Sequence, residues 1–264
     1  MKSAFSLLEL AFVIVILGVV LGVAKFYFVA DKNLALAAKQ IQNDLAYTRN
    51  LALMQAAFRA FDTSVAKDEW FKARWQGLKY PQRFLCLKAR WQVYFIRSKS
   101  ATNDEQTYTI FLDKNGDGNA NLGKNELNLD REIAVDILNA KKLMNSGQSG
   151  VISKDDERAN ARFNIEKKFG VKAVEFRGAC AGATRVIFDE FGRLYSPLKN
   201  ANAPYEKLLF HKNAPCVIRL KNAQEQSICI VLDTLSGYAF VPKTQNANSQ
   251  RLEFNGQSVE CGEI

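Results

Sequence analysis

The sequence is poor in the residues that most catalytic and metal-binding sites need. It contains 1 histidine, His211, and none of its 5 cysteines stands in a Cys-x-x-Cys pair. Histidine-based catalysis and zinc binding therefore have almost no side chains to draw on. The chain also lacks the glycine-rich and serine motifs that hold phosphates or activate a nucleophile. We predict a protein that is not an enzyme, with no cofactor and no metal ligands.

Positive charge exceeds negative charge in this chain. The 36 Lys and Arg residues against 27 Asp and Glu residues give a formal net charge of +9. Such an excess attracts polyanions such as nucleic acid and anionic lipid, and it also keeps proteins soluble. Charge alone therefore does not choose between a binding role and simple solubility.

The N-terminus carries the strongest signal in the chain. Residues 1–4 form a short leader with Lys2, and residues 5–30 are almost entirely apolar apart from Glu9 and Lys25. A stretch of ~20 apolar residues is long enough to cross a bilayer, so the pattern predicts a transmembrane helix over 5–30. Lys2 favours a cytoplasmic N-terminus and an exported C-terminal part. Glu9 is costly in lipid unless it is paired or reaches the headgroups.

The string Ala4-Phe5-Ser6-Leu7-Leu8-Glu9-Leu10, with the apolar run that follows, resembles the class III signal of type IV pilins and pseudopilins. The resemblance implies that a prepilin peptidase cuts between Ala4 and Phe5 and methylates the new amino group of Phe5. It also implies that Glu9 neutralises the Phe5 amino group of a neighbouring subunit in a filament. Ala4 stands where the family usually has glycine, and Phe26 where major pilins often have a proline.

A helical stripe continues beyond the apolar run. Leu34, Ala38, Ile41, Leu45, Thr48 and Ala52 recur at three- and four-residue spacing, with Asp44 among the residues off the stripe. This pattern predicts an amphipathic continuation of the helix over 31–57, giving one helix from about Phe5 to Ala57.

The remainder, residues 58–264, reads as a β-rich head. Strands are expected at 91–97, 107–112, 172–177, 184–189, 216–221, 227–232 and 238–242, and a brief helix at 164–170. The predicted fold class is α+β, a long N-terminal helix with a transmembrane half and an amphipathic half packed on an antiparallel β-sheet head, as in pilins. Segments 111–118, 186–194 and 230–238 resemble strand-and-turn units of FimT/GspH-like minor pseudopilins. Residues 58–90 lie outside that resemblance and read as an insertion.

Two segments of the head carry candidate binding chemistry. Asp113-x-Asn115-x-Asp117-Gly118-x-x-Asn121 matches the start of an EF-hand loop, but Lys124 occupies the position of its essential glutamate. A plain Asn/Gly/Asp turn explains the same residues. Between Lys67 and Lys99, basic residues alternate with aromatic ones, as in sequence-independent DNA binding. The candidate DNA contacts are Lys72, Arg74, Trp75, Lys79 and Arg83, against the alternative of a small core beneath a solvated basic face.

The cysteines permit disulfides if the head is exported to an oxidising compartment. Cys180 follows one expected strand and Cys216 opens another, whereas Cys229 and Cys261 both lie in the C-terminal part. We expect the pairs Cys180–Cys216 and Cys229–Cys261, with Cys86 unpaired.

Together these features predict a minor type IV pilin or pseudopilin, a membrane-anchored structural subunit of a type II secretion or competence-type filament. Its partners would be other pilin subunits, the prepilin peptidase and an inner-membrane assembly platform, with its head in the periplasm. Two alternatives stay open. One is a DNA-binding receptor subunit of a DNA-uptake pilus, and the other is a signal-anchored periplasmic binding protein that does not polymerise.

Overall fold

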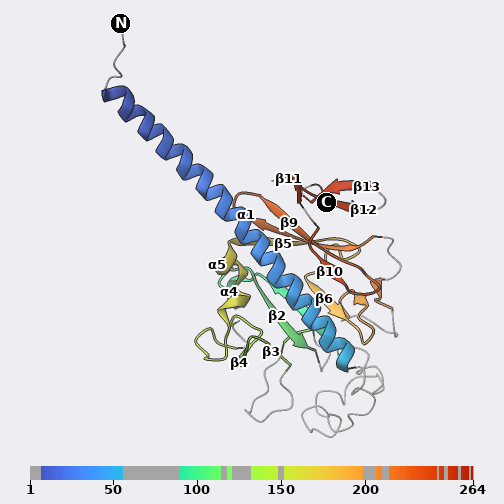
Figure 1. The fold of residues 1–264 in the computed structure, drawn as a ribbon. Helices are drawn as coiled ribbons and strands as arrows, with labels where there is room; N and C mark the ends of the chain where they lie inside the picture. The colour runs from blue at the N-terminus through green and yellow to red at the C-terminus, as the bar shows by residue number, and fades with distance from the viewer. Residues whose placement is uncertain are drawn as a thin grey trace.

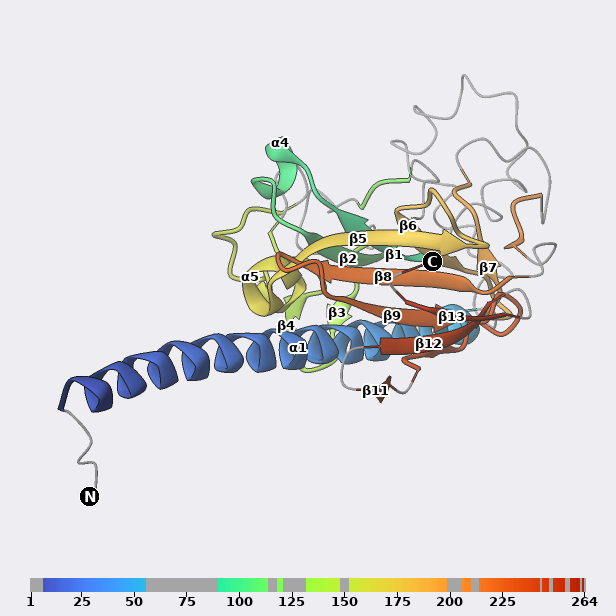
Figure 2. The same ribbon diagram turned by 90° about the horizontal axis from the view of Figure 1, so that it is seen from above.

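The structure is a computed structural model that describes residues 7–55, 90–113, 118–120, 132–147, 152–198, 206–209, 214–242, 244–246, 249–254, 257–261 and 263. Within α1 it describes the backbone alone at 7–9, 21–31 and 55. A long helix extends from a β-rich head, and its N-terminal part stands clear of the head (Figures 1 and 2).

The long helix, α1, is Leu7–Gln55, 49 residues with no proline, or ~74 Å at the usual rise per residue. Every residue of the expected stripe, Leu34 to Ala52, is buried in the head. The outward side of the same segment carries the exposed Lys39, Asn43 and Asn50. The three- and four-residue spacing of the stripe thus determines which side of α1 the head covers.

Strands and short helices follow in the order of the chain. The first group is β1 Trp91–Ile96, α4 Lys99–Thr102, β2 Thr107–Leu112, β3 Val135–Asp136, β4 Asn139–Leu143, η2 Ala161–Phe163, α5 Ile165–Phe169, β5 Val171–Gly178 and β6 Arg185–Phe188. The second is β7 Leu194–Tyr195, β8 Cys216–Asn222, β9 Ser227–Leu232, β10 Ala239–Phe240, β11 Thr244–Asn246, β12 Ser249–Phe254 and β13 Gln257–Glu260.

The strands form two four-stranded antiparallel sheets, in the orders β2-β1-β6-β7 and β10-β9-β8-β5. A three-stranded sheet of β11, β12 and β13 and the β3–β4 hairpin complete the head. The main core lies between α1 and the two larger sheets, where Ile41 and Leu45 meet residues such as Val93, Ile110 and Ile230.

The predicted fold class is wrong in two respects. The head is not one antiparallel sheet: β8 and β9 bury both faces, with Ile218 and Ile230 toward α1 and Val217 and Val231 under Leu252 of β12. Alternation of side chains across a strand makes this second covering layer necessary. The second correction concerns the predicted transmembrane half of the N-terminal helix. Among the described residues, no helix is long and apolar enough to cross a membrane.

Two disulfides join the cysteines that the sequence analysis paired. Cys180–Cys216 links the turn after β5 to the start of β8, and Cys229–Cys261 ties the residue after β13 to β9. The second bond, together with Gln250, which accepts a hydrogen bond from the Cys229 amide, holds the C-terminal sheet on β9. Cys86 lies outside the described residues.

Candidate functional site: the apolar end of α1 and its joint with the head

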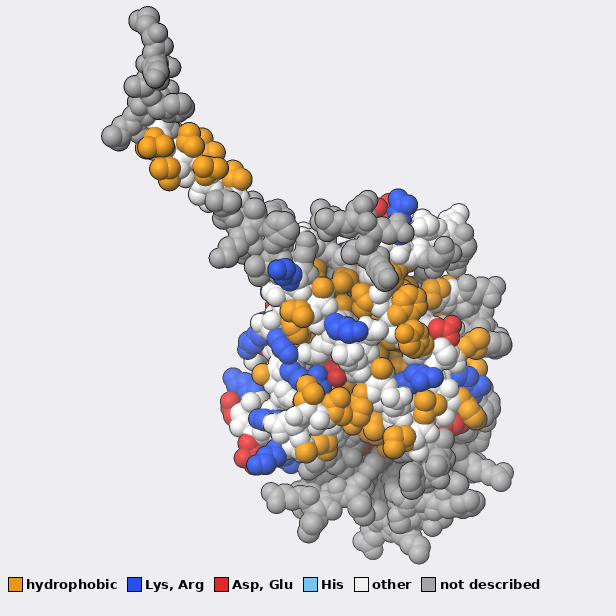
Figure 3. Space-filling view, viewed as in Figure 1, with side chains coloured by type: hydrophobic (Ala, Val, Ile, Leu, Met, Phe, Trp, Pro, Cys, Tyr) orange, Lys and Arg blue, Asp and Glu red, His pale blue; other side chains and the backbone are white. Residues whose placement is uncertain are grey.

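The N-terminal part of α1 is an exposed apolar rod. The large apolar residues from Leu10 to Val20 are between 45% and 64% exposed, and consecutive positions from Phe12 to Leu17 are exposed alike. Since successive residues of a helix point about 100° apart, this surface surrounds the helix. Figure 3 shows it as a column of hydrophobic side chains beyond the head. Exposed apolar surface of this kind marks a binding surface.

A buried ionic cluster joins α1 to the head. Arg162, in η2, pairs with Asp44 of α1 and with Asp136 of β3, both at 2.9 Å. The carboxylates of Asp44 and Asp136 are buried, with 3% and 2% of their side-chain surfaces exposed, and Arg162 is partly buried, with 11% exposed. Removing one partner from such a cluster leaves an uncompensated buried charge, so the three residues depend on one another.

Neutral side chains complete the cluster. The Tyr108 hydroxyl donates to Asp44, and Gln40 Nε2 donates to both the Tyr108 hydroxyl (2.7 Å) and the Arg162 carbonyl (2.8 Å). Asn160 donates to Asp136. Gln40 and Asp44 stand one helical turn apart on α1, so one side of this helix contacts η2 and β2 directly and β3 through Arg162.

Burial shifts the pKa of two members of this cluster, Asp44 and Tyr108. It raises the pKa of the Asp44 carboxyl, more than the charge of Arg162 and the hydrogen bonds from Tyr108 and Arg162 lower it. Burial and the nearby Asp44 charge also raise the pKa of Tyr108 well above its ordinary value. Tyr108 therefore stays protonated and acts as a hydrogen-bond donor to Asp44 throughout the physiological pH range.

Sequence reasoning missed this joint. Asp44 was expected off the buried stripe, yet it is 2% exposed. A signal was present, because Asp44 follows Ile41 by three residues and precedes Thr48 by four, both on the stripe. Its partner Arg162 ends the polar segment 139–162, which fits either a surface loop or a short helix, and only the tertiary fold brings Arg162 and Asp136 to α1.

Several expected site residues lie outside the described part of the chain. These are the cleavage residues Ala4 and Phe5, the side chain of Glu9, and the candidate DNA contacts Lys72, Arg74, Trp75, Lys79 and Arg83. The expectations for them remain predictions.

Three described residues at the end of the basic and aromatic segment have roles in the fold. Arg90 is 2% exposed, pairs with Glu190, and its guanidinium lies 4.9 Å from the centre of the Tyr195 ring. Trp91 packs against the main core, and Arg97 pairs with Asp104. Trp91 therefore fits the alternative in which aromatic residues of this segment form core, whereas the buried Arg90 is not part of a solvated basic face.

Asp113 and Gly118, on either side of residues 114–117, which lie outside the described part of the chain, are joined by a hydrogen bond. The Asp113 carboxylate accepts hydrogen bonds from the Gly118 amide at 2.9 Å and from Gln92 Nε2 at 3.1 Å. Gly118 has φ +81°, a conformation that suits glycine. Within the described ranges, no group of three or more His, Cys, Asp or Glu side chains is placed to hold a metal.

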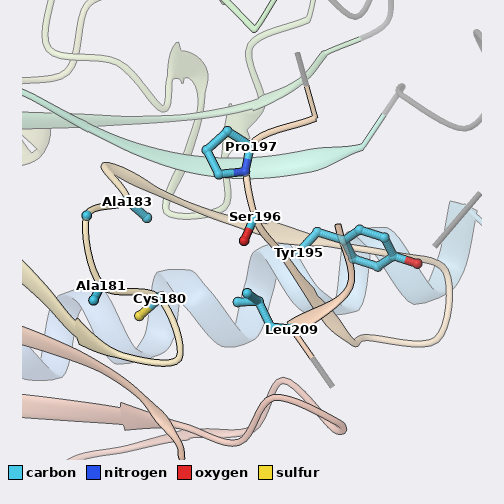
Figure 4. Close-up of a pocket in the computed structure, with 8 residues that line it drawn as sticks. Cys180, Ala181, Ala183, Tyr195, Ser196, Pro197 and Leu209 are labelled. Carbon is cyan, nitrogen blue, oxygen red and sulfur yellow. The ribbon is translucent and has the colours of Figure 1, made fainter. Parts of the chain in front are cut away.

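A shallow pocket of about 100 Å³ lies between the turn at Cys180 and the segment Tyr195–Pro197 (Figure 4). The Tyr195 hydroxyl points away from the other lining side chains in this view. Small residues such as Ala181 and Ala183 line the pocket, and none of its lining side chains is charged.

Comparison with known proteins adds no relative: no protein-family model, no curated protein and no solved structure matches the chain.

Proposed function

We propose that the chain is a subunit of a pilin-type filament, a minor pilin or pseudopilin, working by assembly and contact and not by catalysis. The observation that carries the proposal is the exposed apolar end of α1, Leu10–Val20, standing clear of the head. A helix that is apolar on all sides must be covered by lipid or by other apolar helices. This apolar end belongs to the same run of sequence as the prepilin-like signal at Ala4 and Phe5.

The joint at Arg162 supports the same role. A filament transmits load between its helical core and the heads around it, and this requires a rigid attachment. Here the buried stripe of α1 and the ion pair between Asp44 and Arg162 provide one. We place the protein in the inner membrane before assembly, with the head in the periplasm, where both disulfides are stable.

Cross-linking between copies tests the proposal. Val13→Cys and Leu17→Cys, each in a Cys86→Ser background, place a thiol on the exposed apolar rod. In cells with an active assembly system we expect a bismaleimide reagent to join these positions to neighbouring subunits. Asn43→Cys, exposed on the head-bound part of α1, is the matched control. Monomer at positions 13 and 17, with assembly proven active by another subunit, would contradict the proposal.

A further inference from the structure

The head contacts α1 on two opposite flanks. On the first flank, Asp44 is joined through Arg162 to the β3–β4 hairpin. On the second flank, Gln42 donates to a carbonyl of β10, and Arg49 donates to a carbonyl of the turn that precedes β10. Because successive residues of a helix are about 100° apart, Gln42 and Arg49 share one side of α1 and Asp44 lies roughly 150° away. Figure 1 shows the hairpin and β10 on opposite sides of α1.

Each flank presents large apolar side chains to solvent. On the first flank, Ile137 and Leu138 connect β3 to β4 and are 56% and 77% exposed, and we call this pair the hairpin tip. On the second flank, the turns between β6 and β7 and between β9 and β10, together with β10, expose four side chains that we call the turn patch: Phe191 at 61%, Leu235 at 49%, Tyr238 at 62% and Phe240 at 39%. Exposed apolar side chains gathered in this way mark an interaction surface.

Both surfaces are held in one shape by contacts within the head. At the hairpin tip, the Leu138 amide donates to the Asp136 carboxylate at 3.2 Å. At the turn patch, a Cβ at Gly237 would lie 2.1 Å from the Gly192 carbonyl oxygen, so the two turns touch. Two aromatic rings of the turn patch also stack, with 6.2 Å between their centroids. A preformed surface loses little conformational entropy when it binds a partner.

The two surfaces stand at the same height along α1. Asp44, which is joined to the hairpin, lies in the sequence between Gln42 and Arg49, which contact the side of the turn patch. The helix between residues 42 and 49 is only about 10 Å long. When two copies stand side by side with their α1 helices parallel and level, the hairpin tip of one copy therefore comes beside the turn patch of the next.

The charges around the turn patch cancel. Four charged side chains at its two turns form two ion pairs, Arg193–Asp189 and Arg90–Glu190. Arg49 and Asp233 add one charge of each sign. Ile137 and Leu138 carry no charge, so they can be buried against this neutral surface without leaving a charge unpaired.

We propose that the hairpin tip of one copy of the chain packs against the turn patch of the neighbouring copy. The proposal rests on the filament role proposed above, in which the apolar rods bring α1 helices alongside one another. A contact between two different surfaces repeats from copy to copy along a filament and does not stop at a pair. It covers both exposed apolar surfaces, whereas contact of either surface with itself leaves the other one exposed.

Cysteines placed beside the two surfaces test the contact. Ala140→Cys lies next to the hairpin tip and Ser236→Cys lies in the turn patch, and both positions are exposed. Two forms of the full chain, each with Cys86→Ser and one of these cysteines, are produced together in cells with an active assembly system. We expect a bismaleimide reagent to join a copy with Cys at 140 to a copy with Cys at 236. Either form produced alone should give no cross-linked dimer.

Matched substitutions show whether the apolar side chains hold the contact. Adding Leu138→Ser or Tyr238→Ser should lower the yield of the 140–236 product about tenfold, the usual loss on removing an interface hot spot. Leu36→Ser removes a side chain of α1 that is 57% exposed and belongs to neither surface. This control should leave the yield unchanged, and an equal loss in Leu36→Ser would contradict the proposal.

Cross-links through the rod, at Val13→Cys and Leu17→Cys, report assembly in the same cells. If they form and the 140–236 product does not, the proposed contact is wrong and the filament role stands. If neither forms while another subunit assembles, both proposals are contradicted. Dimers from either cysteine form alone would indicate a two-fold contact and overturn the proposal. So would cross-links from 140 and 236 that join only a different subunit.

Discussion

Arg162 donates two hydrogen bonds to Asp44, from Nη1 to Oδ2 at 2.9 Å and from Nη2 to Oδ1 at 3.1 Å, across 118 residues of sequence. The same guanidinium also donates to Asp136 from Nε at 3.0 Å and Nη2 at 2.9 Å. One partly buried cation thus holds together a buried carboxylate of α1 and a buried carboxylate of the head.

Loss of this cation should weaken the whole head. We expect Arg162→Met to lower the free energy of unfolding by about 3–5 kcal/mol, because Asp44 and Asp136 are left buried without a counter-charge. Denaturant titration of the full chain in detergent measures the change. The control is Arg158→Met, whose pair with Asp156 is partly exposed and should contribute at most about 1 kcal/mol.

A second substitution distinguishes charge from packing. If the loss in Arg162→Met comes from stranded carboxylates, adding Asp44→Asn should restore part of the lost stability. Equal losses in Arg158→Met and Arg162→Met, or no recovery with Asp44→Asn, would show that the cluster is not what holds α1 to the head.

Glu175 on β5 should make stability depend on acid pH. Partial burial raises its pKa, but hydrogen bonds from Arg219, Lys221 and Arg177 outweigh that effect and bring the pKa to about 2. A carboxyl whose pKa falls on folding contributes stability above its unfolded value, near 4.5, and that stability is lost as the pH falls toward the folded value. We expect the wild type to lose stability relative to Glu175→Gln between those two values, by on the order of 1–2 kcal/mol.

Thermal melts at a series of acid pH values, with Glu157→Gln as an exposed control, measure this difference. Parallel pH profiles for the wild type and Glu175→Gln would contradict the prediction.

The turn between β6 and β7 and the turn between β9 and β10 meet at Gly192 and Gly237, and this contact should not tolerate a side chain. We expect Gly237→Ala to cost more stability than Gly182→Ala, although both glycines have positive φ, +65° and +76°. Both substitutions carry the backbone strain of about 1 kcal/mol. A Cβ at position 237 also meets the Gly192 carbonyl, whereas nothing lies within 4 Å of a Cβ at position 182. Equal melting temperatures would show that the turns do not interlock.

The features that sequence predicted well depend on local pattern. The stripe from Leu34 to Ala52 gave the buried side of α1, because helical spacing alone decides it. The aromatic and β-branched run at 107–112 matches β2 at both ends. The cysteine pairs also matched, since Cys180 and Cys216 flank strands that became neighbours.

The features that sequence did not reveal depend on distant contacts. The C-terminal sheet of β11, β12 and β13 was not expected from the sequence, and Cys229–Cys261 and Gln250 fix it on β9. Arg162 ends a polar segment that fits either a surface loop or a short helix, and its role follows from the fold that places η2 against Asp44. The head became layered because β8 and β9 are apolar on both faces.

Processing of the N-terminus tests the filament-subunit role most directly. The measurement is the intact mass of the full chain extracted from membranes of a strain with active prepilin peptidase. We predict a mature protein that begins at Phe5, lacks Met1 to Ala4 and carries one added methyl group. A chain that keeps Met1 under these conditions would contradict the assignment to the pilin class.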